Sequence, residues 1–429
     1  SFIDTELAET ARLLPMRRTV NNLGRPTRGA ALGLRARVLL YAASPLYNGN
    51  LDFFNVVDNK GNQLISQTYD ESKWAKAAAA AKDVIELAKT SGLYELYTIA
   101  PKIGTLDMYR PPVHPEYSTK DYPDGWANID PLLSYKSNFD GSVQGSKNPE
   151  LIFTRTSDGT GTINDWMYQA LPRTISGNNR LCVTQKQVNA YAMNDGRTIS
   201  EAANTGDYVT TGFTTEAYSE NNPFLPAKVS LMYNKREPRF YASIAYNGSV
   251  WEAASASEPR YRNQQIFYYR GTEDGKQGFK EECPLTGMTL KKFYNSEDSR
   301  TDGGYVIEKT EMTIRYAEIL LIYAEALNEL SEGEVYHLKT YSNEDVEIKR
   351  DEDEMRYAIK RIRMRAGVPD YTNETYKNQA DFRVKLKRER KVELLGENSM
   401  RYFDLRRWKD ALTEENQLLQ GCNINISDD

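Results

Sequence analysis

The sequence predicts a mainly α protein in which tandem helix pairs form a bracket, with a large irregular central insertion that contains short β-strands. Two observations predict this class. Apolar residues recur with helical spacing over residues 27–92 and again after residue 310. Between them, residues 93–309 are rich in Gly, Pro, Asn, Asp and Ser. We therefore expect an N-terminal helical part (1–92), an irregular part with ligand loops (93–309) and a C-terminal helical part (310–429), packed as one unit.

The first helix pair is predicted from two neighbouring segments. The run that begins at Thr27 has Gly and Ala along one side, which lets a second helix approach closely, and Ser44-Pro45 ends it. The second run is Ala-rich, with Asp70 or Ser72 to cap its start and Gly92 to end it. Two such helices form an antiparallel pair, the unit of a tetratricopeptide-like repeat.

In the middle of the chain, short aromatic or β-branched runs predict strands of small sheets. These runs are LIFTR, RFYASIAY and QIFYYR. In the stretch before RFYASIAY, we expect Arg236, Glu237 and Arg239 to pair with other charges and with loop carbonyls. Pro238 is expected to fix a turn before a strand.

Three segments predict the C-terminal helices. They are residues 312–330, residues 354–366 and residues 381–412, the last broken into two helices near Gly396. Glu318 and Glu325 share the first of these helices with Arg315, and we interpret them as partners in ion pairs between helices. The Arg, Glu and Asp residues between 388 and 407 are interpreted in the same way, as structural forks at the edge of a core.

Composition and motifs exclude several classes of function. The net charge of -5 comes from 55 basic and 60 acidic residues without a basic stripe, so nucleic acid is not expected as a partner. No apolar stretch approaches the roughly 20 residues of a membrane span. The sequence has two His, three scattered Cys and no nucleotide, Ser-nucleophile or zinc motif. We therefore name no catalytic residues, no metal site and no cofactor. Paired carboxylates for glycoside cleavage stay open at this point, because 60 acids make chance pairs inevitable.

Five ordered segments carry a family resemblance. They are GRPTRGAALGLRARVLLYAASPLYN, VTQKQVNAYAMNDG, NKREPRFYASIAYNG, IRYAEILLIYAEALNE and ERKVELLGENSMRYFDLRRW. Together they resemble the SusD/RagB family, surface lipoproteins of Bacteroidota that capture nutrients beside a TonB-dependent transporter. The stretch ENSMR departs from the family's Glu-Gly-x-Arg, so the local turn is expected to differ. The family's lipidated Cys is not in this sequence, which we expect to lack both natural termini.

The resemblance implies a function and a place. It implies non-catalytic capture of a glycan at the cell surface and its delivery to a SusC-like TonB-dependent transporter. It also implies a location at the outer membrane through a lipid anchor. The alternative is a peptide-capturing RagB-like protein; a helical-repeat scaffold and a glycoside hydrolase are less favoured.

Exposed aromatic rings in the irregular part are the candidate ligand contacts. The apolar C–H face of a sugar packs on such a ring, and nearby amides and acids meet its hydroxyls. The loop that contains Trp126 is the first choice. The candidate residues are Trp126, Tyr122, Tyr109, Asp124, Asn128, Trp166 and Tyr168. Trp251, close to the Arg-rich stretch, is interpreted as structural, and Trp74 and Trp408 as core residues of helices.

Overall fold

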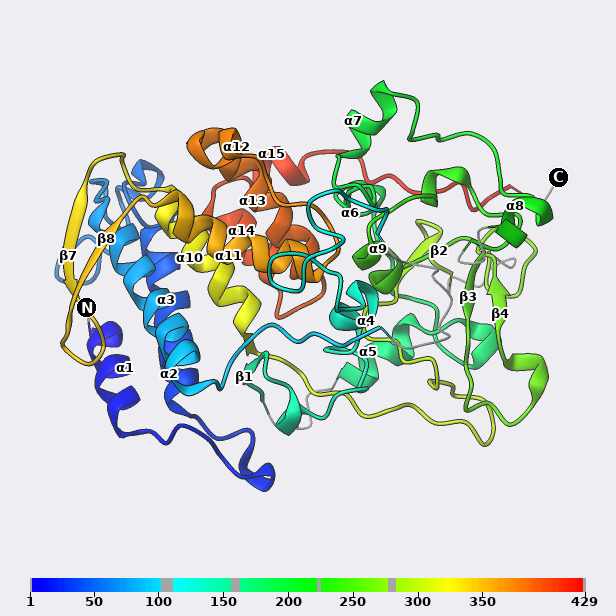
Figure 1. Cartoon of the computed structure of the whole chain (residues 1–429), viewed down its shortest axis with the longest axis horizontal. Helices are drawn as coiled ribbons and strands as arrows, with labels where there is room; N and C mark the ends of the chain where they lie inside the picture. The colour runs from blue at the N-terminus through cyan, green and yellow to red at the C-terminus, as the bar shows by residue number, and fades with distance from the viewer. Residues whose placement is uncertain (1, 102–110, 156–162, 222–224, 277–282, 427–429) are drawn as a thin grey trace.

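The computed structural model describes residues 2–101, 111–155, 163–221, 225–276 and 283–426. Helices from both ends of the chain lie together at one end of the molecule, and the residues between them form the other end (Figure 1). The fold is mainly α with a few short strands, as predicted. The longer helices are α1 Phe2–Leu13, α2 Arg28–Ala43, α3 Ser72–Ser91, α10 Tyr316–Asn328, α11 Glu352–Arg365, α13 Gln379–Glu393 and α14 Met400–Arg407.

The predicted pair α2 and α3 is confirmed together with its boundaries. The Thr27 hydroxyl accepts a hydrogen bond from the amide of Ala30 and so caps α2. At the start of α3, the Asp70 carboxylate accepts one from the amide of Ser72. Gly92 ends α3 with φ +63°, a left-handed conformation that glycine adopts without steric cost.

Helix α10 is the centre of the helical core. All 13 of its residues are buried, and α2, α3, α11 and α13 pack around it. One hydrophobic cluster therefore contains residues from both ends of the chain. A second cluster, formed mostly by residues 135–312, is the core of the irregular part.

Close packing at the α2–α3 interface depends on small side chains. Ala78 is fully buried on α3, which packs against both α2 and α10. We expect Ala78→Leu to lower the free energy of unfolding by about 1–3 kcal/mol, because the added carbons have no space. Lys76→Leu, at an exposed position of the same helix, is the control and should stay within about 0.5 kcal/mol. If urea denaturation showed the same loss of stability for Ala78→Leu and Lys76→Leu, the proposed need for small side chains at this interface would be contradicted.

Both predicted ion pairs of α10 connect it to other helices. The guanidinium of Arg37 on α2 donates to both Glu318 oxygens at 2.7 and 2.6 Å. Arg407 on α14 donates to both Glu325 oxygens at 2.5 and 2.7 Å. The interpretation of these two acids as structural is therefore confirmed.

Helix α1 and a β-hairpin in the C-terminal part are among the elements that the sequence analysis missed. Strands β7 Val335–Lys339 and β8 Asp345–Lys349 pair antiparallel, and their residues alternate between more and less exposed positions. His337 lies on β7 with its side chain exposed to solvent.

The irregular part contains pairs of short strands and several short helices. β1 Leu151–Phe153 pairs with β6 Ile314–Arg315, β2 Ile244–Tyr246 with β5 Met288–Leu290, and β3 Ser249–Trp251 with β4 Gln264–Ile266. The short α-helices of the chain are α4 Pro131–Lys136, α5 Ile163–Ala170, α6 Gln185–Val188, α7 Ile199–Asn204, α8 Glu216–Asn221, α9 Pro238–Ser243, α12 Asn373–Lys377 and α15 Ala411–Glu415. Single 3₁₀ turns are Val20–Asn22, Leu51–Phe53, Gly145–Lys147, Arg173–Ile175, Leu231–Tyr233 and Pro259–Tyr261.

In the stretch 235–239, the sequence analysis predicted the kinds of partner of the arginines correctly, but it did not predict the backbone conformation after Pro238. Arg236 donates to the carbonyl oxygens of Val188 and Tyr191 at 2.7 and 2.9 Å. Arg239 pairs with Glu237 at 2.7 Å. Pro238, however, does not lead directly into a strand: it is the first residue of α9, where its missing N–H is no loss, and β2 follows only at Ile244.

A buried network of ion pairs joins the irregular part to the C-terminal helices. Arg315, next to α10, pairs with Glu150, Glu393 and Glu397 at 2.6–2.9 Å. Arg365 on α11 pairs with Glu150 and Glu393, and Arg239 also reaches Glu393. The forks predicted from the charged C-terminal segment are therefore present, and their carboxylates are buried.

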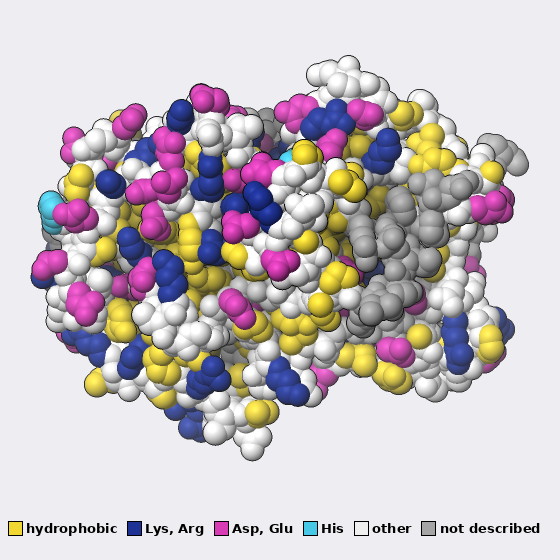
Figure 2. Space-filling view, in the orientation of Figure 1, with side chains coloured by type: hydrophobic (Ala, Val, Ile, Leu, Met, Phe, Trp, Pro, Cys, Tyr) yellow, Lys and Arg dark blue, Asp and Glu magenta, His cyan; other side chains and the backbone are white. Residues whose placement is uncertain are grey.

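On the surface, acidic and basic side chains are interspersed and no single sign dominates the visible face (Figure 2). Such a mixture lacks the basic stripe that a nucleic-acid-binding protein shows. Within the described ranges, none of the helices has both the length and the apolar character needed to cross a lipid bilayer.

Candidate ligand-binding site

The first-choice loop does not present an exposed tryptophan. The Trp126 side chain is only 6% exposed and belongs to a small cluster with Tyr117, Ile129 and Met364 of α11. Its ring lies 5.6 Å from that of Tyr117, measured between centroids. The prediction that Trp126 offers a free face to a sugar is therefore wrong: the ring packs the loop onto α11.

Three further predicted residues of this loop also serve to hold it in place. The Asp124 carboxylate accepts from Lys360 of α11 at 2.7 Å. The Asn128 side-chain oxygen accepts from the amide of Tyr122 at 2.9 Å. Burial raises the pKa of the Tyr122 hydroxyl well above its usual value, and its ring packs against the helical core. Tyr109 lies outside the described residues.

The two remaining candidates, Trp166 and Tyr168, are both on helix α5 but point to different sides of it. Trp166 and Tyr168 are two residues apart, so they lie about 200° apart around the helix and cannot form one platform. The guanidinium of Arg300 covers the Tyr168 ring, 4.3 Å from its centroid. Trp166, by contrast, is 48% exposed. Of the two, Trp166 is the ring available to a ligand.

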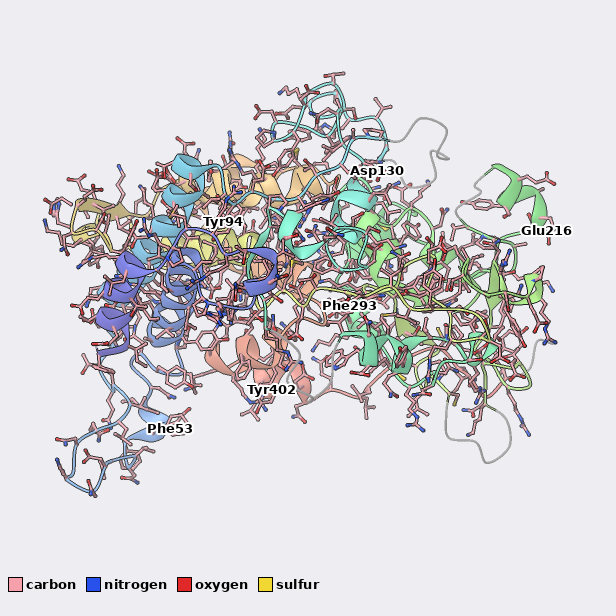
Figure 3. The ribbon with its side chains drawn as sticks, turned by 90° about the horizontal axis from the view of Figure 1, so that it is seen from below. Phe53, Tyr94, Asp130, Glu216, Phe293 and Tyr402 are labelled. Atoms are coloured by element: carbon pink, nitrogen blue, oxygen red, sulfur yellow. The ribbon has the colours of Figure 1, made fainter. Side chains whose placement is uncertain are left out.

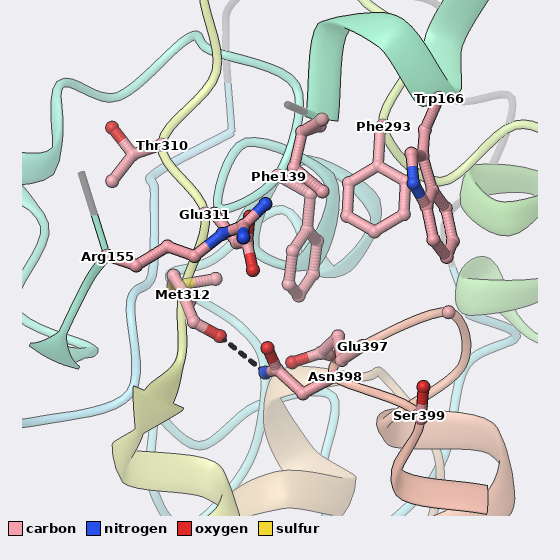
Figure 4. Close-up of a pocket in the computed structure, with 12 residues that line it drawn as sticks. Phe139, Arg155, Trp166, Phe293, Thr310, Glu311, Met312, Glu397, Asn398 and Ser399 are labelled. Atoms are coloured by element: carbon pink, nitrogen blue, oxygen red, sulfur yellow. Dashed lines mark hydrogen bonds and ion pairs between the residues drawn. The ribbon is translucent and has the colours of Figure 1, made fainter. Parts of the chain in front are cut away.

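Trp166 lines a pocket of about 110 Å³. Figure 4 shows the rings of Trp166, Phe293 and Phe139 beside one another, with Arg155 and Glu311 on another side. The lining residues come from separate parts of the chain. They are Phe139, Arg155, Ile163, Trp166, Phe293, Thr310, Glu311, Met312, Gly396, Glu397, Asn398 and Ser399.

The floor of this pocket is the turn between α13 and α14. The Asn398 side chain donates to the carbonyl oxygen of Met312 at 2.9 Å (Figure 4). Gly396, Asn398 and Ser399 have φ of +73°, +44° and +55°. Left-handed backbone at two non-glycine residues is strained, and such strain is concentrated at functional positions. This is the stretch ENSMR, where the sequence already indicated an altered turn.

Both carboxylates at the pocket have cationic partners. Glu311 accepts from Arg155 at 2.8 Å. Glu397 pairs with Lys292 and Arg315 at 2.5 and 2.6 Å. Burial alone would raise the pKa of Glu397, but the charges of Arg315 and Lys292 outweigh it and hold that pKa below the usual range. The pocket thus combines apolar rings with fixed polar groups.

The remaining tryptophans lie where the sequence predicted. Trp251 is fully buried against Tyr294, with ring centroids 4.6 Å apart, and Trp74 and Trp408 are buried on the helical side. Among the described residues, no three His, Cys, Asp or Glu side chains come together as a possible metal site. Other exposed rings, such as Phe54, lie beyond the pocket; Figure 3 shows the neighbouring Phe53 on a segment that extends away from the helical body.

The architecture places this protein in a class in which paired helices form a bracket and support a large irregular part with an aromatic-lined pocket. It is neither a barrel nor a doubly wound sheet. The profile of the SusD family matches residues 109–429. The chain belongs to the SusD family. No curated protein matches it significantly.

Solved structures support the same fold. A protein named BT4246 has a TM-score of 0.70 and 24% identity and covers 96% of this chain. The SusD-like protein BF3747 from Bacteroides fragilis has a TM-score of 0.59 and 22% identity over 96% of this chain. BF0978 from the same species, called a SusD-like carbohydrate-binding protein, has a TM-score of 0.56 and 20% identity, again over 96%. The matches cover 65%, 60% and 58% of those chains, so this chain spans less than two thirds of their length.

Proposed function

We propose that this protein binds an oligosaccharide without cleaving it and passes it to a SusC-like TonB-dependent transporter. The observation that carries the proposal is the exposed Trp166 ring at the edge of a pocket with fixed polar groups, in a member of the SusD family. The name of BF0978, a similar structure, supports carbohydrate as the ligand class.

The geometry of the pocket suits a sugar. A pyranose would place its C–H face on the Trp166 ring, and its hydroxyls would meet the Ser399 hydroxyl and the Asn398 amide. Because the neighbouring loops are anchored by ion pairs and hydrogen bonds, little conformational entropy is lost on binding. Only part of an oligosaccharide fits in about 110 Å³, so the rest of the chain would lie along the surface.

Cleavage is not part of the proposal because the pocket has no evident proton donor. Glycoside hydrolysis requires one carboxyl group that keeps its proton and a second that is ionised. Glu311 and Glu397 are both paired with cations, and the pKa of Glu397 is lowered. Glu397 is therefore expected to remain ionised at neutral pH.

Location and partner follow from family membership. We place the protein at the cell surface of a member of the Bacteroidota, held at the outer membrane by a lipid anchor. The transporter should then be recovered with it when the protein is isolated from native membranes under mild detergent. Isolation without any barrel protein would count against this part of the proposal.

The role of Trp166 is tested by binding. On a glycan array and then by calorimetry, we expect Trp166→Ala to weaken binding of the best glycan by at least about tenfold, since it removes the stacking ring. Phe54→Ala is the matched control: that ring is 59% exposed and lies on the loop between α2 and α3. Its affinity should equal that of the wild type.

Three other outcomes have defined meanings. Unchanged affinity in Trp166→Ala would remove this pocket as the glycan site. Binding of peptides and of no glycan would favour the RagB-like alternative. Release of shorter products from a bound glycan would overturn the non-catalytic assignment.

A further inference from the structure

A second cavity lies apart from the Trp166 pocket, under the C-terminal tail. It has a volume of about 480 Å³, in the range of known ligand pockets of roughly 300–1,000 Å³. Its walls come from α6, α13, α14, α15 and the residues after α15. They are Thr184, Lys186, Gln187, Lys391, Arg401, Glu414, Glu415, Gln417, Leu418, Leu419 and Gln420.

The tail is fixed at both edges of this cavity. At one edge, the Glu414 carboxylate accepts from Lys186 at 2.9 Å and from Arg401 at 2.8 Å. At the other, the carbonyl oxygen of Gln420 accepts from the amide of Gln185 at 2.9 Å. In Figure 1 the tail leaves α15 and passes α6 on its way to the C-terminus. Residues 415–419 therefore arch over the cavity between two anchored points.

Three cationic side chains converge on the cavity, and one of them lacks a carboxylate partner. Glu414 already serves both Lys186 and Arg401. Lys391 donates only to the carbonyl oxygen of Lys186, at 3.3 Å, and no ion pair is found for it among the described residues. The two other lysines of α13 do have such partners, Asp381 for Lys385 and Asp410 for Lys387.

The half-buried Lys391 ammonium therefore lacks the counter-charge that such a position calls for. Burial, together with the positive charges of Arg401 and Lys186, lowers its pKa to about 8, although Glu414 and Glu415 act in the opposite direction. An anion in the cavity would be attracted by all three cations. It would also stabilise the charged form of Lys391.

We propose that this cavity binds an oxyanion, a carboxylate or a sulfate, with Lys391 as its main ionic contact and Lys186 and Arg401 beside it. Ammonium and guanidinium groups form short, charge-assisted hydrogen bonds to such oxygens. The oxyanion is either a free small anion or the charged group of an acidic sugar. This site is independent of Trp166, which does not line the cavity.

Calorimetry at pH 7 with inorganic sulfate, sodium glucuronate and neutral glucose tests the proposal. We expect sulfate and glucuronate to bind and glucose not to bind at this site. Lys391→Gln should weaken anion binding by about tenfold to a hundredfold, and Lys391→Arg should retain most of it. Lys385→Gln, on the same helix but outside the cavity, is the matched control and should bind as the wild type does.

Comparing sulfate with glucuronate also shows whether the bound anion is a free ion or the charged group of a sugar. Tighter binding of glucuronate than of sulfate would indicate a sugar-borne group, and equal binding a site for the charge alone. The proposal is overturned if neither anion binds, if Lys391→Gln binds as well as the wild type, or if glucose binds as well as glucuronate. Thermal unfolding of each variant shows that lost binding is not lost folding. Trp166→Ala should leave anion binding intact, so failure of the glycan proposal would be recognised separately.

Discussion

Replacing Glu393 by alanine is expected to lower the free energy of unfolding by about 3–5 kcal/mol or to prevent folding at 37 °C. The Glu393 carboxylate is fully buried and is shared by Arg239, Arg315 and Arg365. Without it, positive charge remains in the interior with too little compensation. Urea denaturation, with the midpoint and slope compared to wild type, measures the loss.

The matched control is Glu374→Ala on α12. Glu374 is 84% exposed on its side chain and pairs with Lys377 one helical turn away, at 3.6 Å. Pairs of this kind contribute about 0.2–1 kcal/mol, so the control should be nearly neutral. A Glu393 variant as stable as the control would show that the network is not important for stability.

The charge pattern of the sequence predicted this network because acids and arginines lie within one helical turn of each other in the segments that form it. The sequence between 388 and 407, and the stretch 235–239, each place acidic residues close to arginines. What the sequence did not give was the partner across space. Arg239 and Glu393 are 154 residues apart, and only the fold brings them to 2.9 Å.

The long helices were predictable because their apolar spacing, caps and terminators agree with one another. The missed hairpin had a weaker signal. β7 and β8 alternate in exposure, but most of their outward residues are polar, and the segment around them resembles a loop. Helix α1 has one buried residue, Ala11, and therefore almost no apolar stripe to detect. Such marginal elements depend on contacts made elsewhere in the fold.

For the candidate site, the sequence identified aromatic residues but not which of them are covered. Trp126 is buried because Tyr117 and Met364 lie against it, and Met364 is 238 positions away in the chain. The walls around Trp166 come from residues near 139, 155, 293, 310 and 397. No local pattern could have assembled them. The altered turn at ENSMR was the one signal for the floor of this pocket.

Acid should unfold the protein at a pH well below neutrality, through the same buried carboxylates. Burial alone would raise their pKa values, but the adjacent arginines and lysines lower them below the ordinary 4.5 for Glu and 3.8 for Asp. The unfolded chain therefore takes up protons near pH 4 while the folded chain does not. The contribution of these carboxylates to stability is complete above about pH 4.5 and falls as the pH decreases, by roughly 3 kcal/mol or more by pH 3.

Four buried aspartates, Asp83, Asp274, Asp298 and Asp370, contribute with the opposite sign because burial raises their pKa values, and the shift is largest for Asp83. Burial raises the pKa of Asp83 to about 6 despite its ion pair with Arg35, so its contribution weakens folding as the pH rises from about 4 to 6. Urea midpoints between pH 3 and 8 should therefore pass through a broad maximum rather than rise steadily. Asp83→Asn should flatten the pH 4–6 limb and leave the acid limb steep. A midpoint that stays constant from pH 7 to pH 3 would mean that the buried carboxylates are not held ionised by their arginine partners.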